Sequence, residues 1–326
     1  MTSDAAQHRN HGSGRVFPIP LWLCVCVLIV IELSLSAWLC HSVIAPRVGT
    51  GWAWAVWLLE PFALRKLIAL ASYGLSRWRG MPLLPAQRMG GLAWLRFFTV
   101  EYFHLCLQNL VQLPLRVLFH TATERGQHTG TGRVLLLQHG YVNSGAVWHF
   151  TARALERLGY RVFTIDQPVF ASIDVMAERL AARLDEVRRL TGAAQVTLIA
   201  HSMGGLICRA YLRRFGGDAV AQLITLGSPH HGTHHAYLAA GENGAQMRPD
   251  NAWLAALNAV PVTVPFVSMY SVHDTVISPQ DSSAMPEARN IVVSGIGHVS
   301  MPGGRAMRMQ LLRALQSFEA PAVRPH

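Results

Sequence analysis

This chain has few cysteines, which argues against a disulfide-rich domain and against a domain held together by a cysteine-ligated metal. The 326 residues hold five cysteines, and their spacing matches neither a disulfide framework nor a set of metal ligands. A chain of this length can bury a stable hydrophobic core without disulfides or a structural metal. We therefore expect no metal and no cofactor.

Runs of basic residues are also lacking. The formal net charge is +10, but Lys66 is the only lysine among 28 basic residues, and no basic run exceeds a pair such as Arg188 and Arg189. Nucleic-acid-binding proteins usually cluster their basic residues on one face. We therefore expect no nucleic-acid partner. The basic excess in residues 1–130 flanks apolar segments, which is typical of charge beside a membrane.

One apolar segment is long enough to cross a bilayer. Glu32 is the only formally charged residue from position 16 to position 46. Within that stretch, residues 21–43 could span about 30 Å of hydrocarbon as a helix. Arg9 and Arg15 precede it, so residues 1–20 are predicted to be a tail facing the cytoplasm. A cleaved signal peptide is the alternative, although no small-x-small cleavage site follows.

A second apolar stretch, residues 51–75, is interrupted by Glu60 and Pro61. It fits either the return helix of a membrane hairpin or a kinked helix lying in the interface. The choice decides on which side of the membrane the rest of the chain lies. Residues 76–132 are predicted to hold an amphipathic helix at 93–119, packed on the membrane or on the domain that follows, and then a linker at 126–132.

After residue 132 the pattern changes to short apolar runs alternating with helical periodicity. This predicts an α/β fold over residues 133–326, with a mostly parallel sheet covered by helices on both faces. Ligands of such sheets bind at the carboxyl ends of the strands. The expected strands are 134–138, 161–165, 196–200, 222–226, 265–270 and 290–294, and the expected helices include 147–158, 177–191, 203–215 and 305–318.

The strongest local motif is Ala200-His201-Ser202-Met203-Gly204-Gly205. It follows an expected strand and opens an expected helix, which is the setting of a nucleophile elbow. The elbow lifts a serine hydroxyl clear of the sheet, where a base can activate it. Ser202 is therefore the predicted nucleophile.

A second loop follows the first strand of the sheet, with the sequence Gln138-His139-Gly140-Tyr141. A loop at this place supplies one backbone N–H to an oxyanion hole, and the residue after the nucleophile supplies the other. We predict that these donors are the N–H groups of Tyr141 and Met203.

The nucleophile needs a histidine base and an acid, expected in the order serine, acid, histidine. His298 stands just past the last expected strand, in Gly295-Ile296-Gly297-His298. Asp274 follows the preceding strand and is the predicted acid, with Asp281 as the alternative. Asp166 also ends a strand but precedes the nucleophile, so we expect it to be structural.

These motifs, together with Leu226-Gly227-Ser228-Pro229-His230-His231-Gly232-Thr233, resemble the bacterial triacylglycerol lipase family and its esterase relatives. They are also similar to the lipase-like domains that deacylate membrane glycolipids. The resemblance covers about residues 133–318. It implies an α/β-hydrolase fold, a catalytic triad of Ser202, Asp274 and His298, and a lipid or acyl-ester substrate. With the apolar segment, it implies an enzyme anchored in the bacterial inner membrane.

Three functions stay open at this point. Hydrolysis of a carboxylic ester through an acyl-enzyme at Ser202 is favoured. Acyl transfer would use the same triad, and a membrane protein with a non-catalytic, hydrolase-like binding domain is the third possibility. Residues 233–262 are long for a connection, so their expected helix at 252–257 is either a lid over an acyl pocket or an ordinary connecting helix.

Overall fold

The computed structural model describes residues 21–126 and 132–319. The predicted tail at 1–20, most of the predicted linker and the last seven residues of the chain lie outside this range. We call residues 21–126 the N-terminal helical region and residues 132–319 the sheet region.

The sheet region contains one six-stranded sheet in the order β2-β1-β3-β4-β5-β6, and every neighbouring pair is parallel. Each strand coincides with one of the predicted strands to within two residues, so the predicted parallel sheet is confirmed. In register, Ala200 pairs with both Gln138 and Thr225, which brings the carboxyl ends of three strands level. The strands are β1 (Val134–Gln138), β2 (Arg161–Ile165), β3 (Val196–His201), β4 (Val220–Leu226), β5 (Phe266–Ser271) and β6 (Arg289–Val293).

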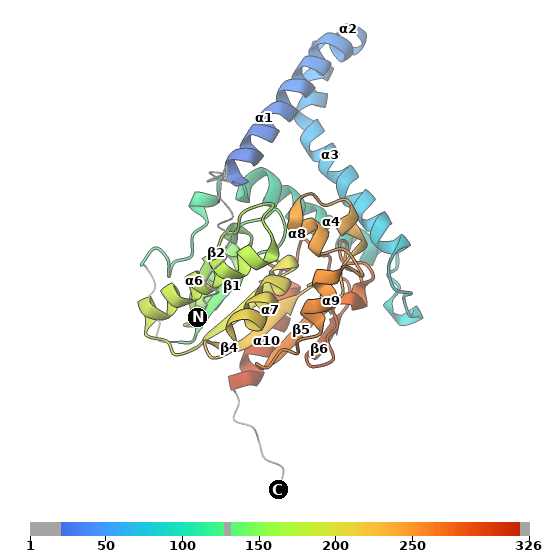
Figure 1. The fold of residues 1–326 in the computed structure, drawn as a ribbon. Coiled ribbons are helices and arrows are strands. Elements are labelled where there is room, and N and C mark those ends of the chain that lie inside the picture. Colours follow the sequence, from blue (N-terminus) through green and yellow to red (C-terminus); the bar gives the residue numbers. More distant parts are fainter. Residues whose placement is uncertain (1–20, 127–131, 320–326) are drawn as a thin grey trace, which may run out of the picture.

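Helices cover both faces of this sheet, as predicted (Figure 1). Leu136 of β1 belongs to the core on one face, whereas its neighbours Leu135 and Leu137 belong to the core on the other. Both sets are fully buried, which explains why the strands are nearly continuous apolar runs. One face is covered by α6 (Ile173–Thr191), α7 (Met203–Phe215) and α9 (Ala252–Asn258), and the other by α5 (His149–Arg157) and α10 (Arg305–Glu319). The short helix α8 (Gly241–Gln246) contacts α6, where the side chain of Gln246 accepts the N–H of Ile173 at 2.7 Å.

Helix α6 shows how local sequence sets an element's bounds. Its N-cap is Ser172, whose hydroxyl accepts the N–H of Val175 at 3.3 Å. Its C-cap is Gly192, which has a φ of 69° that a glycine adopts without strain. Leu180 and Leu184 lie on the predicted apolar face and are fully buried against the sheet.

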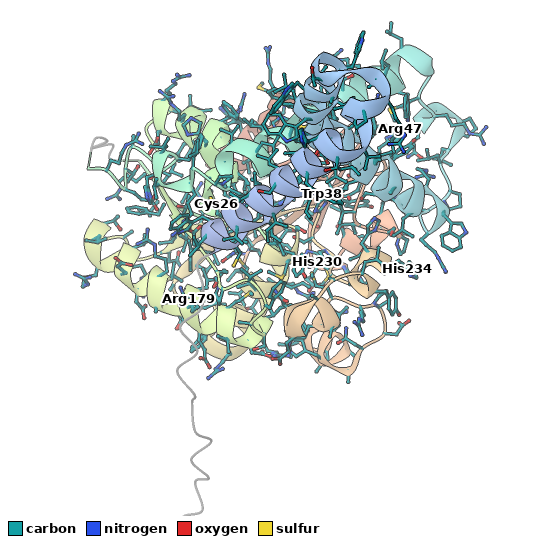
Figure 2. The ribbon with its side chains drawn as sticks, turned by 90° about the horizontal axis from the view of Figure 1, so that it is seen from above. Cys26, Trp38, Arg47, Arg179, His230 and His234 are labelled. Atoms are coloured by element: carbon teal, nitrogen blue, oxygen red, sulfur yellow. The ribbon has the colours of Figure 1, made fainter. Side chains whose placement is uncertain are left out.

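The N-terminal helical region stands on the sheet region as an arch (Figure 1). Helix α1 (Leu21–Leu39) continues through a π-helical turn (Cys40–Ile44) into α2 (Ala45–Val48), and α3 (Thr50–Trp78) returns toward the sheet. Seen from above, α1 passes over the sheet region, with Cys26 and Trp38 along it (Figure 2). Within the described residues, Leu21–Val48 is the one helical stretch that is long and apolar enough to cross a membrane.

Two polar contacts join α1 to α3. The guanidinium of Arg65 pairs with both carboxylate oxygens of Glu32, with 2.8 Å between Nη2 and Oε2. The indole N–H of Trp57 donates to the carbonyl oxygen of Leu33 at 3.0 Å. A carboxylate in an apolar segment is costly when it is unpaired, so Arg65 offsets the cost of Glu32.

The rest of the N-terminal helical region packs on the sheet region. Helix α4 (Gly91–Leu107) ends earlier than the helix predicted at 93–119, and a π-helical turn (Gln108–Gln112) and a 3-10 turn (Arg116–Leu118) follow it. The π-helical turn ends at Gln112, two residues before Pro114, which lacks the N–H that a continuing helix needs. Helix α4 lies against the sheet region, where the side-chain amide of Gln108, in the turn after it, donates to the carbonyl oxygen of Val299 at 2.7 Å.

The Glu32–Arg65 pair yields a stability prediction. Arg65→Leu should lower the free energy of unfolding by about 3 kcal/mol, because it leaves a partly buried carboxylate unpaired. Adding Glu32→Leu should recover most of that loss. Thermal unfolding of the full chain in detergent micelles measures both effects.

The matched control is Lys66→Leu, because Lys66 is the next residue of α3 and is exposed. It should leave the melting temperature nearly unchanged. Equal melting temperatures for Arg65→Leu and Lys66→Leu would contradict a stabilising pair.

Candidate functional site

Ser202 occupies a sharp turn between β3 and α7. Its backbone has φ 58° and ψ −131°, a strained conformation for a residue other than glycine. Its N–H donates to the carbonyl of Leu226 at 2.9 Å, and its carbonyl accepts the N–H of Gly205 at 3.0 Å. A Cβ added at Gly204 would lie 2.8 Å from the carbonyl oxygens of residues 138 and 139, so the turn requires a glycine there. The predicted elbow geometry is present.

The structure brings the three predicted triad residues together. The Nε2 of His298 lies 3.0 Å from the Oγ of Ser202, and its Nδ1 lies 2.9 Å from Oδ2 of Asp274. His298 is 5% exposed and Asp274 is 2% exposed. The loops after β3, β5 and β6 therefore place a hydroxyl, an imidazole and a carboxylate in one hydrogen-bonded chain.

The contacts of Asp274, Asp281 and Asp166 show which of these three carboxylates lies next to the base. Asp274 contacts His298, and its other oxygen, Oδ1, accepts the N–H groups of Val276 and Ile277 at 2.8 and 2.7 Å. Asp281 instead lies in a 3-10 turn (Gln280–Ser283) and lines a different hollow.

Asp166, the third carboxylate, accepts the N–H of Gly145 at 2.7 Å and pairs with Arg116. These contacts tie the loop after β1 to the end of β2. They fit the structural role predicted for Asp166.

The electrostatic setting of His298 favours its protonated form. Burial alone would lower the pKa of this imidazole. The charge and hydrogen bond of Asp274, aided by the charge of Glu101, outweigh burial and raise the pKa above its ordinary value. His298 can therefore accept a proton from Ser202 and hold it as a cation.

His201 packs beside this imidazole. Burial lowers the pKa of His201 well below its ordinary value, so its ring is neutral. Its Nε2 lies 3.1 Å from the carbonyl oxygen of His298 and must carry the proton, since a carbonyl can only accept. The two ring centroids are 4.6 Å apart. This hydrogen bond from His201 fixes the position of the His298 backbone.

The loop after β1 approaches Ser202 closely. A Cβ added at Gly140 would lie 2.7 Å from the Cβ of Ser202. The ring of His139 accepts the N–H of Gln167 at Nε2, 3.1 Å away, so its Nδ1 donates to the carbonyl of Gly140 at 2.8 Å. Burial lowers the pKa of His139 to about 4, which keeps this ring neutral. Because Gly140 O and Tyr141 N share one planar peptide, His139 also fixes the direction of the Tyr141 N–H.

The two predicted oxyanion donors are free to bind a ligand. Among the hydrogen bonds of the described residues, none is donated by the backbone N–H of Tyr141 or of Met203. Met203 is the first residue of α7, where helix N–H groups lack internal partners and the helix dipole favours negative charge.

A cavity of about 180 Å³ opens at Ser202. The side-chain hydroxyl of Tyr141 donates to the carbonyl of Ala240 at 2.8 Å and accepts its N–H at 2.9 Å, which pins one wall in place. Most of the lining is apolar, and it consists of Tyr141, Ser202, Thr233, His235, Ala236, Leu238, Ala239, Met247, Val276 and Ile277.

The segment after β4 lines this cavity, but the helix expected at 252–257 does not take part. Helix α9 packs on α7, where Arg209 donates to Asn258 at 2.9 Å, and its Leu254 and Leu257 are buried in the core. Of the two roles expected for this helix, the structure shows the connecting helix. Within this segment, the residues that line the cavity come from 233–247.

The two histidines at 230 and 231 lie outside the lining of this cavity. His230 is fully buried, with its Nε2 3.1 Å from the hydroxyl of Thr225. Thr233, the last residue of the same motif, and His235, two residues beyond it, do line the cavity.

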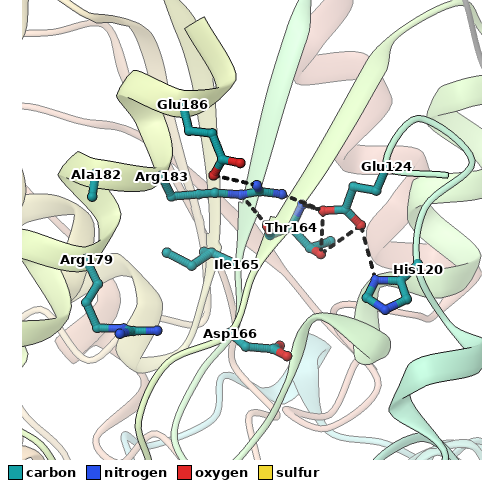
Figure 3. A pocket seen from close by; sticks show the side chains of 9 residues that line it. All are labelled: His120, Glu124, Thr164, Ile165, Asp166, Arg179, Ala182, Arg183 and Glu186. Atoms are coloured by element: carbon teal, nitrogen blue, oxygen red, sulfur yellow. Dashed lines mark hydrogen bonds and ion pairs between the residues drawn. The ribbon is translucent and has the colours of Figure 1, made fainter. Parts of the chain in front are cut away.

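A larger hollow of about 630 Å³ lies away from Ser202, at the end of β2 (Figure 3). Its charged side chains largely neutralise one another, since Arg183 pairs with Glu124 and Glu186, both at 2.9 Å. None of the predicted site residues lines it. Within the described residues, no group of three or more metal-ligating side chains is found.

Residues of the N-terminal helical region also reach the site, which the sequence did not predict. Ser76 of α3 donates to the backbone carbonyl of Asp274. Glu101 of α4 accepts hydrogen bonds from residues beside both Asp274 and His298. The sequence offered one signal for Glu101, which is the only carboxylate in the apolar, aromatic stretch at 93–119.

Comparisons with known proteins agree with this architecture. The family model described as the alpha/beta hydrolase fold matches residues 133–252. A triacylglycerol lipase of Pseudarthrobacter phenanthrenivorans is 31% identical over 118 residues, which are 33% of this chain and 37% of the relative. A pimeloyl-[acyl-carrier protein] methyl ester esterase of Vibrio cholerae is 34% identical over 105 residues, 31% of this chain and 39% of the relative. The chain thus spans little more than a third of the length of these curated relatives.

A solved structure agrees with this likeness in fold. The mature lipase BlEst2 of Bacillus licheniformis superposes with a TM-score of 0.52 at 18% identity, covering 57% of this chain and 92% of that chain. The sheet order, the loops and the matching family model together show an α/β-hydrolase fold, and over the matched residues the chain is similar to bacterial lipases and esterases.

Proposed function

We propose that this protein is a serine hydrolase that cleaves carboxylic esters, with Ser202 as nucleophile, His298 as base and Asp274 as the acid that supports the base. The observation that carries the proposal is the hydrogen-bonded chain from Asp274 through His298 to Ser202. These three side chains lie at the carboxyl edge of the sheet. Beside them are the backbone N–H groups of Tyr141 and Met203, which donate to no acceptor within the described residues.

The proposed reaction has two halves. In the first, the Ser202 oxygen attacks the ester carbonyl carbon while Nε2 of His298 takes the hydroxyl proton. The carbonyl oxygen becomes an oxyanion, which the N–H groups of Tyr141 and Met203 stabilise. When the tetrahedral intermediate collapses, the ester C–O bond breaks, and His298 gives its proton to the leaving alcohol.

The second half repeats these steps with water. His298 takes a proton from water as the water oxygen attacks the acyl-enzyme carbonyl carbon. Collapse of the second intermediate releases the acid and returns the proton to Ser202. Throughout, Asp274 holds Nδ1–H and stabilises the imidazolium, as the direction of the His298 pKa shift requires.

A lipid-like acyl ester is the substrate class that we infer. The cavity at Ser202 has apolar walls, including Leu238 and Ile277, and a curated relative carries the name triacylglycerol lipase. At about 180 Å³, the cavity is smaller than most ligand sites, which begin near ~300 Å³. It suits a short acyl segment, so a long chain would require the covering residues 233–247 to move.

The alternative of a non-catalytic binding domain accounts poorly for this geometry. Binding alone requires neither a serine held at a strained φ nor an imidazole aligned with it. No observation in the structure favours acyl transfer over hydrolysis.

We also infer that α1 anchors the protein in a membrane, the inner membrane in a bacterial cell, and is retained there. Cleavage as a signal peptide would remove Glu32, the partner of buried Arg65. It would also remove the carbonyl that the Trp57 indole binds. These contacts support an integral helix.

The first prediction concerns the nucleophile. Ser202→Ala should reduce the hydrolysis of a short p-nitrophenyl ester by about a million-fold, because the attacking oxygen is gone. The melting temperature should change little. Near-normal turnover by the pure variant would remove the proposed function.

The second prediction concerns the acid. Asp274→Asn should lower kcat by about ten-thousand-fold, because the amide selects the wrong tautomer of His298. Asp281→Asn is the matched control and should stay near wild type, since Asp281 lines a separate hollow. The opposite ranking of the two variants would transfer the role to Asp281.

The third prediction concerns the anchor. The full chain should stay in the membrane fraction after washes with high salt and alkaline carbonate, because an apolar helix is insensitive to charge screening. Recovery in the soluble fraction with an intact N-terminus would contradict an integral α1. A mature N-terminus near residue 40 would instead establish a signal peptide.

A further inference from the structure

Glu101 is a buried carboxylate that reaches the catalytic loops from another part of the chain. It lies on α4, in the N-terminal helical region, and is 3% exposed. Its Oε1 accepts the N–H of Val299 at 2.7 Å and the hydroxyl of Thr275 at 2.6 Å. Its Oε2 accepts the N–H of Ser300 at 2.9 Å. Three donors therefore converge on one carboxylate.

These donors lie directly beside the proposed triad. Val299 follows His298, and Thr275 follows Asp274, so one side chain holds the residues after both the base and the acid. The hydroxyl of Thr275 also accepts the N–H of His298 at 3.3 Å. A continuous path of hydrogen bonds thus joins Glu101 to the backbone of His298.

The loop after β6 packs closely against the carboxylate of Glu101. A Cβ added at Gly297 would lie 2.3 Å from the carboxylate carbon of Glu101, so the backbone can approach it closely only as glycine. Gln108, two turns further along the chain, donates to the carbonyl of Val299 at 2.7 Å. The loop therefore rests on α4 and on the turn that follows it.

We propose that Glu101 is a positioning residue, which sets the placement of His298 relative to Asp274 and Ser202 and thereby makes the N-terminal helical region part of the catalytic centre. This inference rests on the proposed function. Its physical basis is preorganisation, since the loops that carry base and acid are otherwise free to shift against each other.

The charge of Glu101 has a second effect that can be measured separately, which is on the pKa of His298. The charged and titratable groups that face His298 are Asp274, Glu101 and the rings of His201 and His235. Burial lowers the pKa of both neighbouring rings, so they are neutral. The two carboxylates raise the pKa of His298, and removing the charge of Glu101 should lower it.

The test is Glu101→Gln in the full chain, assayed in detergent on a short soluble ester. The amide keeps the size but loses the charge and one acceptor, and its NH₂ opposes a backbone N–H. We expect kcat to fall by about tenfold to a hundredfold with little change in KM. The acidic limb of kcat/KM should move to lower pH, because neutral His298 is the active form.

Glu178→Gln is the matched control, since Glu178 is an exposed carboxylate of α6. It should keep both kcat and the acidic limb. A second variant, Thr275→Val, removes the path between Glu101 and the N–H of His298 without changing any charge. It should lower kcat and leave the acidic limb in place.

The outcomes separate this inference from the proposed function. If Glu101→Gln melts like the wild type and keeps its kcat and its acidic limb, the inference is overturned. If Glu101→Gln fails to fold, Thr275→Val decides, and wild-type kcat in that variant overturns the inference. An inactive wild type, or an active Ser202→Ala, would instead overturn the proposed function itself.

Discussion

The rest of the site depends on one constraint, which is that three loops must place an imidazole within hydrogen-bond distance of a hydroxyl on one side and of a carboxylate on the other. The distances are 3.0 Å from Ser202 Oγ to His298 Nε2 and 2.9 Å from His298 Nδ1 to Asp274 Oδ2. The parallel sheet meets this constraint because β3, β5 and β6 end at the same edge. The strained turn at Ser202 is stable because the backbone of Leu226 and the close packing at Gly204 over-determine it.

The N-terminal helical region carries the candidate membrane span and also supports the site. Helix α3 contacts α1 through Arg65, near its middle, and contacts the backbone of Asp274 through Ser76, near its C-terminal end. Helix α4 places Glu101 between the loops of the acid and the base. A boundary at residue 132 therefore divides the chain by sequence pattern, but it cuts through hydrogen bonds that support the site.

The sequence could predict what local patterns encode. Apolar runs marked the six strands, and the small residues around Ser202 marked the tight turn. The sequence could not predict the pairs Glu32–Arg65 and Glu101–Thr275, because 33 and 174 residues separate their members and no local periodicity relates them. The helix expected at 252–257 shows the same limit, since its apolar face fits a lid as well as a connecting helix on the core. Tertiary packing on α7 decided between the two.

The most direct test of this account is to identify the residue that reacts with a fluorophosphonate. The purified full chain would be treated with the reagent in detergent, digested and mapped by mass spectrometry. The account predicts one phosphonylated residue, Ser202, because its oxygen has a base aligned with it and two free backbone N–H groups beside it. An unmodified Ser202, or a modification at a different residue in an active preparation, would contradict the account.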